Sequence, residues 1–501
     1  MNSTEISMNP NELVQFLKKS PENFTSTDLT NFSKEYGIQV VNFRYVAEDG
    51  RLKTLNFFIT SEEYLKTILT HGERVDGSSL FSFVEAGSSD LYVIPRYRTA
   101  FLNPFAEIPT LEIFCSFYNN EGRPLESDPG YILRKANKWF SKETGLTFKS
   151  LGELEYYVIA PKEDAYPTTD QKGYHECEPF SKYEFIRTEA LHLLAKAGCS
   201  IKYGHAEVGC FSDDSNYYEQ HEIEFLPTQV ERAAEQVILA KWILRMLGYK
   251  HGVDISFAPK ITVGKAGNGL HFHILIEKDG VNQTSVNGKI SEVSRKMIAG
   301  ILNAADAITA FGNTIPTSYL RLVPHQEAPT NICWGDRNRS VVVRVPLGWT
   351  AAGNMISDAN PQETDEVLNG ASKQTFEFRV PDGSADIYLT LAALVVTSLN
   401  GIKDENALQT AEKLYVDGNI FSPQNKAKLA HLKQLPLSCH ESAEALERNR
   451  EIFETGRIFP KGLIDNHIKK LKSFNDKELS EKIFGKTDEI KTLVEKYIHV
   501  G

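Results

Sequence analysis

Polar side chains two residues apart recur along four segments that are otherwise apolar. The pairs are Glu153 and Glu155, Glu222 and Glu224, His271 and His273, and Glu377 and Arg379. Successive side chains of a strand point to opposite faces of a sheet, so both members of a pair would share one face. A single pair of this kind is typical of a solvated strand. Four pairs among Leu, Val, Ile and Phe favour strands of one curved sheet whose polar faces line a cavity.

The carboxylates of such a cavity need positive partners. At an effective dielectric of about 20, two carboxylates ~4 Å apart repel each other by about 4 kcal/mol. Glu207 lies shortly before the second of these segments and would add a further carboxylate. Ligation mainly by oxygen, with one imidazole, favours Mg²⁺ or Mn²⁺ over zinc. The acidic pairs therefore predict bound divalent cations.

Arginines concentrate in one segment of the second half of the chain. Arg321, Arg337, Arg339 and Arg344 stand with Glu327 among prolines and a valine run, which predict a loop and a buried strand. Guanidinium groups in such a place are costly unless anions meet them, and their planar fork fits carboxylate and phosphate oxygens. An internal cluster of Arg–Glu salt bridges explains the segment equally well. The ligand alternative, together with two divalent ions, predicts a phosphoryl-transfer enzyme but does not name its substrates.

Composition limits the classes of protein to which the chain can belong. Its length of 501 residues predicts two domains. Its composition, 41% hydrophobic and 24% charged, is typical of a globular protein, and its formal net charge is −11. The negative charge argues against general binding to nucleic acid or to anionic membranes. The N-terminus lacks the features of a secretory signal, and the apolar run at 388–399 is too short to span a membrane. Six dispersed cysteines predict reduced thiols, so we expect a cytoplasmic protein.

The first 130 residues predict an extension and a small β-rich domain. Residues 1–35 have a weak helical pattern and would form an N-terminal helical extension, and residues 36–130 would form the domain. Apolar alternation and turn residues predict its elements: strands at 40–46, 52–59, 90–94 and 110–117, and a helix from a capping box at Thr60 to about Thr70.

Residues 131–501 predict a larger domain in which helices alternate with strands. Periodicity and glycine stops predict its helices: 131–144, 182–197, a long helix from a capping box at Thr228 to Gly248, 291–311 and 385–399. The tail after Lys403 is charged and helical. These elements indicate an α+β fold in which the two domains pack closely.

A series of motifs carries a more specific resemblance. In order they are Asp76-Gly-Ser-Ser79, Gly152-Glu-Leu-Glu155, Glu207, Gln220-His-Glu222, Gly267-Asn-Gly-Leu-His271-Phe-His273, Arg321-Leu-Val-Pro324, Glu327-Ala-Pro329, Asn338-Arg-Ser340 and Glu377-Phe-Arg379. In order and spacing they resemble those of type I (bacterial-type) glutamine synthetases, over residues 38–464. The resemblance implies an N-terminal β-grasp domain followed by a larger catalytic domain with a curved, partly closed antiparallel sheet flanked by helices. It also implies a dodecamer of two hexameric rings, with active sites between subunits.

The activity that the resemblance implies is ATP-dependent ligation of ammonia to the side-chain carboxylate of L-glutamate. The intermediate would be γ-glutamyl phosphate, and the products L-glutamine, ADP and phosphate. Two Mg²⁺ or Mn²⁺ ions would be held by six residues: Glu155, Glu207 and Glu222 for one ion, and Glu153, His271 and Glu377 for the other.

The same resemblance assigns residues to the substrates. Glutamate would be bound by Arg321, Arg379 and the backbone of Gly267. ATP would be bound by Glu207, His273, Arg339 and Arg344. The ammonium pocket would consist of Asp76, Ser79, Tyr174, Glu207 and Glu327. The implied catalytic residues are Asp76 as the base, Glu327 on a flap that excludes water, and Arg339 at the transferring phosphoryl group.

Several positions depart from the family pattern. Ala266 stands where an asparagine usually contacts glutamate, and Leu275 and Thr375 replace a serine and an arginine near the nucleotide. An insertion separates Glu207 from Glu222. Two alternatives to glutamine synthesis remain open: a ligase that joins glutamate to an organic amine, and a non-catalytic relative.

Overall fold

The structure is a computed structural model that describes residues 3–82, 84, 89–323, 328–348, 355–363, 373–418, 420, 425–483 and 485–501. A small sheet occupies the N-terminal part of the chain. Its strand order is β2-β1-β6-β4-β3, with β5 beside β6. The bounds are β1 (Val40–Val46), β2 (Leu52–Phe58), β3 (Glu73–Asp76), β4 (Asp90–Pro95), β5 (Phe101–Leu102) and β6 (Thr110–Tyr118). Neighbours run antiparallel except β1 and β6, which run parallel. The four predicted strands are confirmed, and the short β3 and β5 were not predicted.

Four helices cover this sheet: α1 (Ser3–Met8), α2 (Glu12–Leu17), α3 (Ser26–Glu35) and α4 (Glu62–His71). Helix α3 begins with a capping box, in which Thr25 and Asp28 satisfy each other's backbone N–H groups. Leu13 of α2 and Phe32 of α3 lie in the same hydrophobic core as the sheet. Helices α1, α2 and α3 therefore precede the small sheet and pack onto it.

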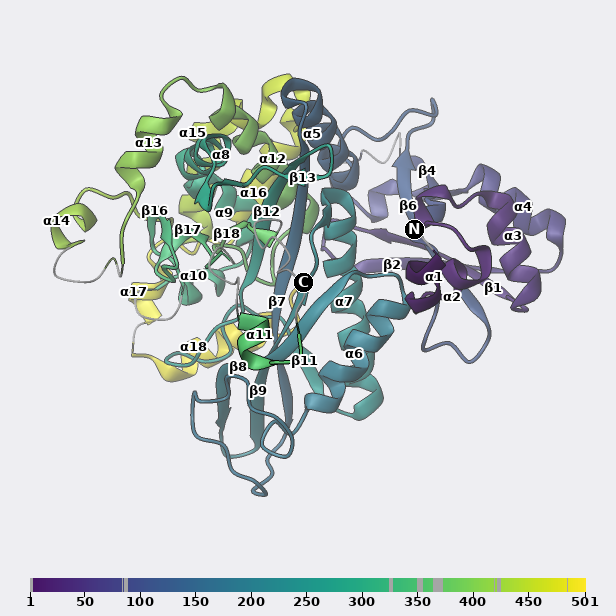
Figure 1. Cartoon of the computed structure of the whole chain (residues 1–501), viewed down its shortest axis with the longest axis horizontal. Helices are drawn as coiled ribbons and strands as arrows, with labels where there is room; N and C mark the ends of the chain where they lie inside the picture. The colour runs from purple at the N-terminus through teal and green to yellow at the C-terminus, as the bar shows by residue number, and fades with distance from the viewer. Residues whose placement is uncertain are drawn as a thin grey trace.

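The large sheet is curved and dominates the rest of the molecule (Figure 1). Its order is β16-β17-β18-β12-β7-β9-β8, with β10 and β11 paired to β7 and β13 to β12. The bounds are β7 (Thr147–Pro161), β8 (Ile201–Ser212), β9 (Asn216–Phe225), β10 (Thr228–Gln229), β11 (Asp254–Ser256), β12 (Leu270–Lys278), β13 (Val281–Asn282), β16 (Asn331–Asp336), β17 (Val341–Val345) and β18 (Phe376–Phe378). The pairings are antiparallel except β16 with β17, which is parallel. A separate hairpin joins β14 (Ser285–Val286) to β15 (Lys289–Ile290).

The described helices that follow the small sheet are α5 (Pro129–Thr144), α6 (Glu184–Lys196), α7 (Val230–His251), α8 (Glu292–Asn303), α9 (Ala305–Gly312), α10 (Ser318–Arg321), α11 (Met355–Ala359), α12 (Ile387–Lys403), α13 (Ala407–Leu414), α14 (Lys426–Leu429), α15 (Cys439–Glu454), α16 (Lys461–Lys472), α17 (Leu479–Ile483) and α18 (Thr487–Tyr497). The longer ones, among them α5, α7, α8 and α12, share one hydrophobic core with the outer face of the large sheet. Helix α12 is buried nearly all round and contacts α5, α8 and α9. Its apolar length, noted in the sequence, therefore belongs to a central core helix. Among the described residues, no helix is both long and apolar enough to cross a lipid bilayer.

Several helix boundaries differ from those predicted. Thr228 lies in β10, and Gln229, the N-cap residue of α7, makes no capping hydrogen bond with its side chain, so the predicted capping box does not form. Gly248 is inside α7, which ends at Gly252 in the left-handed conformation (φ 68°). The predicted helix at 291–311 is two helices that meet at Ala304. Apolar periodicity continues across that break because both helices face the same core.

The predicted α+β class and the curved, partly closed sheet flanked by helices are confirmed. The small sheet contains the parallel β1–β6 pair, and helix α4 packs against β4, which is the β-grasp arrangement. One large hydrophobic core lies between the large sheet and its helices, and a smaller one lies in the N-terminal part. The opposite, concave face of the large sheet carries the polar side chains.

Candidate active site

A cavity of about 280 Å³ lies on the concave face of the large sheet. Its lining consists mainly of charged and polar side chains: Glu153, Glu155, Tyr174, Lys202, Tyr203, His205, Glu207, Gln220, Glu222, Glu224, Ala266, Gly267, His271, His273, Arg321, Arg339, Arg344, Pro346, Glu377 and Arg379. All four polar pairs that the sequence singled out meet here.

Strand register explains this convergence. Directly opposed residues of antiparallel strands point to the same face. The first row across the sheet is therefore His205, Glu222 and Glu155. The second row is Tyr203, Glu224, Glu153 and His271. The third row is His273, Glu377 and Arg344. Neighbouring rows are two residues apart along each strand, which is the spacing seen in the sequence.

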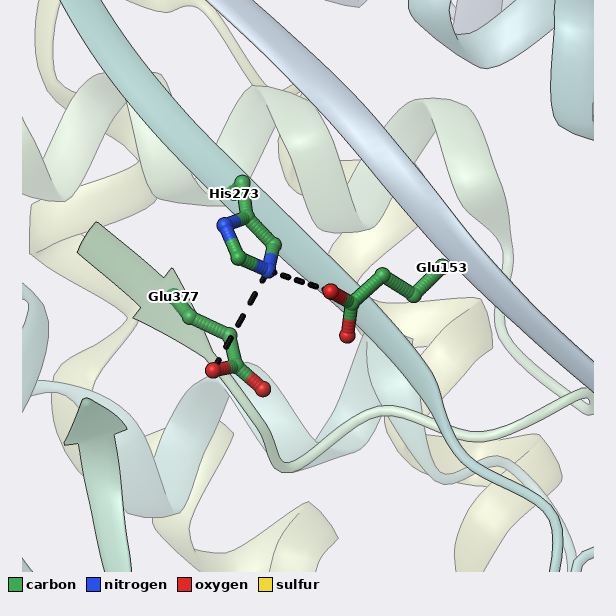
Figure 2. Close-up of side chains that lie close together, drawn as sticks. All are labelled: Glu153, His273 and Glu377. Carbon is green, nitrogen blue, oxygen red and sulfur yellow. Dashed lines mark ion pairs between the residues drawn. The ribbon is translucent and has the colours of Figure 1, made fainter. Parts of the chain in front are cut away.

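Two carboxylates and two imidazoles meet where the second and third rows adjoin. His273 Nε2 lies 2.7 Å from Glu153 Oε1 and 4.0 Å from Glu377 Oε2 (Figure 2). His271 Nδ1 lies 3.1 Å from Glu153 Oε2 and 3.3 Å from Glu377 Oε1. Burial opposes ionisation of Glu153, but the charge of His273 and the hydrogen bonds from neighbouring side chains together outweigh it and hold the pKa of Glu153 well below its ordinary value. Conversely, these carboxylates raise the pKa of His273 to about 8 against the opposing effect of burial.

The first row forms a second acidic group. His205 Nδ1 lies 3.8 Å from Glu207 Oε1, and His205 Nε2 lies 4.0 Å from Glu222 Oε1. Burial, and then the charges of surrounding glutamates, raise the pKa of Glu222 well above its ordinary value. Glu155 is held by the backbone N–H of Gly269, which donates to its Oε2 at 2.7 Å. An additional positive charge would relieve the repulsion within this row.

Both groups fit divalent cations. Glu153, His273 and Glu377 each offer a ligand atom within 4.8 Å of the other two, and so do His205, Glu207 and Glu222. The donors are carboxylate oxygens with imidazole nitrogens, a set that suits Mg²⁺ or Mn²⁺. Of the ligands assigned by resemblance, His271 adjoins the former group, and Glu155 lies opposite Glu222 in the first row. The six assigned residues therefore lie together, with His205 and His273 among them.

Arginines border the acidic rows on the side of β17 and β18. Arg379 Nε donates to Glu377 Oε1 at 2.9 Å, and Arg344 Nη1 donates to Glu377 Oε2 at 3.2 Å. Buried Arg321 donates to the carbonyl of Val380 at 2.9 Å. Salt bridges inside the chain thus account for part of the arginine segment, while the same arginines still face the cavity. Arg337 is not part of the cavity lining.

Two of the predicted site residues, Asp76 and Ser79, lie elsewhere. Asp76 and Ser79 belong to the small sheet and the turn after β3, and they do not line the cavity of their own chain. The Ser79 hydroxyl donates to Asp76 Oδ2 at 2.8 Å. Hydrogen bonds from Ser78 and Ser79 lower the pKa of exposed Asp76 to about 2. Glu327 lies outside the described residues.

The positions that depart from the family pattern have defined places. Ala266 lines the cavity, and its carbonyl accepts a hydrogen bond from the Tyr157 hydroxyl at 2.9 Å. Thr375 Oγ1 lies 2.8 Å from His273 Nδ1 and so fixes that ring. Leu275 is buried in β12. The insertion between Glu207 and Glu222 forms the end of the β8–β9 hairpin.

Three cavity residues with polar or charged side chains were not singled out in the sequence: Lys202, Tyr203 and His205. Strand alternation could have found Tyr203 and His205, because they precede Glu207 by four and two residues. Lys202 precedes Glu207 by five residues, so strict alternation would place it on the other face of the sheet. Its place depends on an irregularity of β8 that the sequence does not announce.

Comparisons with known proteins agree with these observations. The family models "Glutamine synthetase, beta-Grasp domain" and "Glutamine synthetase, catalytic domain" match residues 37–120 and 126–484. Glutamine synthetase of Clostridium saccharobutylicum is 29% identical over 436 residues, which cover 85% of this chain and 90% of that protein. Glutamine synthetase of Thermus thermophilus is 30% identical over 394 residues, covering 76% and 80%.

Solved structures show the same fold. Plasmodium falciparum glutamine synthetase superposes with a TM-score of 0.73 at 21% identity, covering 92% of this chain and 98% of that one. A structure described as GmaS without ligand superposes with a TM-score of 0.72 at 18% identity, covering 91% and 97%. At these identities the likeness extends to the fold alone.

Proposed function

Since the chain belongs to the glutamine synthetase family, we propose that it joins ammonia to the side-chain carboxylate of L-glutamate at the expense of ATP. The reaction would pass through γ-glutamyl phosphate and give L-glutamine, ADP and phosphate. The observation that carries the proposal is the single cavity in which two carboxylate–imidazole groups adjoin buried arginines. Such an arrangement suits a reaction in which positioning and charge neutralisation do most of the work.

Six residues would hold two divalent cations. Glu155, Glu207 and Glu222 would bind one, and Glu153, His271 and Glu377 the other. The closeness of these residues, and the burial of Glu153, Glu222, His271 and Glu377, support this assignment, because ionised carboxylates packed this tightly need cationic partners. When bound, the two ions would neutralise phosphate charge and polarise the phosphorus–oxygen bonds.

The remaining cavity residues would orient the two substrates. Arg321 and Arg379 would bind the α-carboxylate and side-chain carboxylate of glutamate, and the carbonyl of Gly267 its amino group. Gly267 suits such a backbone contact, since a Cβ there would lie only 2.3 Å from the Pro259 carbonyl oxygen. We expect Ala266, beside it, to alter how tightly glutamate is held.

Phosphoryl transfer would then occur between the acidic rows and the arginines. His273 and Arg344, with Glu207 nearby, would orient the ATP phosphates, and Arg339 would stabilise the transferring group. An oxygen of the glutamate side chain would form a bond to the γ-phosphorus, while the bond to the β–γ bridging oxygen breaks and ADP leaves. Thr375 would act through His273 by fixing its ring.

Amide formation would need residues that this cavity does not contain. Ammonia would attack the acyl carbon, and phosphate would leave with the former carboxylate oxygen. Asp76 and Ser79 would complete the ammonium pocket with Tyr174, Glu207 and Glu327, and Asp76 would take the proton of the ammonium ion. Because Asp76 lies in the small sheet outside the cavity, we assign it to the site of a neighbouring copy. A dodecamer of two hexameric rings, in a cytoplasmic location, accords with the family resemblance and the cysteine spacing.

A second candidate is a ligase that uses an organic amine in place of ammonia. Two tyrosines at the cavity favour it: Tyr174 and Tyr203 line it and are each nearly half exposed, at 48% and 45%. Aromatic faces attract organic ammonium ions. The GmaS structures share the fold but not enough sequence to decide between acceptors.

Acceptor competition separates the two candidates. Purified protein would be supplied with Mg²⁺, ATP and glutamate, together with equal concentrations of ammonium and methylamine. Glutamine as the main product would support the first proposal, and γ-glutamylmethylamide would support the second. Absence of both products and of phosphate release would favour a non-catalytic relative.

A further inference from the structure

A β-bulge places Lys202 in the cavity. In the β8–β9 pairing, Ile201 lies opposite Phe225 and Tyr203 opposite Glu224, so Lys202 is an additional residue without a partner position. A bulge redirects the side chain of the extra residue. Strict alternation would place Lys202 on the face opposite Tyr203, but it lines the cavity together with Tyr203.

Two neighbours hold the ammonium group there. Lys202 Nζ forms an ion pair with Glu224, whose side chain is 6% exposed while that of Lys202 is 39% exposed. The same nitrogen lies 4.7 Å from the centre of the Tyr203 ring. Lys202 is therefore fixed on one side by Glu224 and remains open to the cavity on the other.

Lys202 lies at the end of the cavity where the third row of side chains lies. Strand β9 ends at Phe225, so it contributes no residue to the row of His273, Glu377 and Arg344. Glu153 connects the two sides, because it lies opposite Glu224 in the sheet and 2.7 Å from His273. Lys202 thus stands at the β8 side of the same end of the cavity at which His273 and Arg344 stand.

We propose that Lys202 binds the phosphate oxygens of the nucleotide, at the β8 side of the cavity and opposite Arg344. This inference rests on the proposed function. A lysine ammonium is a compact charge with three donors, so it can keep Glu224 as one partner while it binds phosphate with another hydrogen. Lys202 would then determine nucleotide affinity, with little effect on glutamate.

The test is calorimetric titration of the full-length protein with Mg²⁺·ADP. Lys202→Ala should weaken binding about ten-fold at about 0.05 M salt, and the difference should shrink at about 0.3 M salt. Lys202→Arg, which keeps the charge, should restore most of the affinity. Steady-state assays should show a higher KM for ATP with an unchanged KM for glutamate. A purely structural ion pair would not give this split.

Lys149→Ala is the matched control. Lys149 forms an ion pair with Glu277 at 2.7 Å on the same sheet and is 26% exposed, but it does not line the cavity. Its removal should leave ADP affinity unchanged. Titration with inorganic phosphate distinguishes a site for free phosphate from a site for the nucleotide. Loss of phosphate binding in Lys202→Ala without loss of ADP binding would overturn the assignment of Lys202 to the nucleotide.

Two outcomes distinguish this inference from the proposed function. If the wild type binds Mg²⁺·ADP and Lys202→Ala binds it equally well at both salt concentrations, the role of Lys202 is refuted while the proposed function stands. If the wild type binds no nucleotide and releases no phosphate, both are refuted.

Discussion

Glu377 has the most cationic partners of any cavity residue. It is 1% exposed and accepts hydrogen bonds from Arg344 and Arg379, and His271 Nδ1 lies 3.3 Å away. Burial raises the pKa of Glu377, but the charges of Arg379, His273 and His271 together bring that pKa below its ordinary value. A carboxylate held in place by these hydrogen bonds can bind a divalent ion with little reorganisation.

Replacing Glu377 by Ala should therefore abolish turnover. The change removes a proposed ligand and leaves Arg344 and Arg379 without their shared anion, so we expect a loss of at least about 1,000-fold in kcat and one fewer Mn²⁺ bound per chain. Coupled phosphate release and calorimetric Mn²⁺ titration would measure the two effects.

Glu277→Ala is the control for this variant. Glu277 lies on β12 and pairs with Lys149 outside the cavity. It should keep both activity and metal stoichiometry. Normal activity in Glu377→Ala, with the oligomer intact, would refute the metal assignment.

At the scale of elements, helices α8 and α12 approach each other through two glycines. A Cβ on Gly300 would lie 2.1 Å from the Thr397 carbonyl oxygen and 2.7 Å from the Gly401 Cα. Both obstacles are backbone atoms of α12, which cannot move without displacing a helix that is buried nearly all round. This crossing therefore requires the absence of side chains.

Gly300→Ala should lower the free energy of unfolding by about 1–3 kcal/mol through overpacking. Gly462→Ala in α16 is the control, because no heavy atom lies within 4 Å of a Cβ at that position. It should leave stability unchanged or raise it by up to about 1 kcal/mol. Urea unfolding would measure both variants, and equal stability of the two would contradict the close helix contact.

His467 of helix α16 makes the stability of the fold depend on pH. Burial lowers the pKa of His467 to about 4, and its Nε2 lies 2.6 Å from the Ala310 carbonyl oxygen of α9. An unfolded histidine has a pKa of about 6.5, so between these values the unfolded state binds more protons. The contribution of neutral His467 to the free energy of unfolding is fully present above about pH 6.5 and is lost as the pH falls toward 4.

The wild type should therefore lose roughly 1–2 kcal/mol of stability between pH 7 and pH 5 that His467→Gln does not lose. Glutamine can still donate a hydrogen bond but does not titrate in this range. His192→Gln, on the exposed side of α6, is the control and should leave the pH dependence unchanged. Identical pH profiles for wild type and His467→Gln would contradict this account.

Local regularity decides which elements and site residues the sequence could predict. Residues 147–161 form one strand whose pairing with β9 has no bulge, so alternation placed Glu153 and Glu155 correctly. Lys202 escaped the same rule because the β8 bulge changes its face. The end of α7 was missed because Gly248 is tolerated inside a helix whose neighbours bury it against Ile255.

At the scale of the whole molecule, the proposed site is divided between two sheets. The cavity carries the acidic rows and arginines of the large sheet, whereas Asp76 lies in the small sheet. No periodicity in one chain could predict that relation, because it would be made between copies. Oligomers have symmetric interfaces, so every cavity of a closed ring would receive an equivalent Asp76.

Mixed oligomers test this division. Asp76→Ala and Glu377→Ala should each be inactive alone, since each removes one half of the site. Co-expression of the two should restore part of the wild-type activity, because some interfaces would combine an intact Asp76 with an intact cavity. Affinity tags on the two chains would verify that mixed oligomers form. No activity in verified mixed oligomers would argue that each chain completes its own site.

The most direct measurement is product analysis by mass spectrometry under multiple turnover. The purified protein would be incubated with Mg²⁺, ATP and L-glutamate, with ¹⁵N-ammonium as the acceptor and chelated protein as the blank. The account predicts one labelled glutamine and one phosphate for each ATP consumed, and no product after chelation. Phosphate release without labelled glutamine, or labelled glutamine formed equally well after chelation, would contradict it.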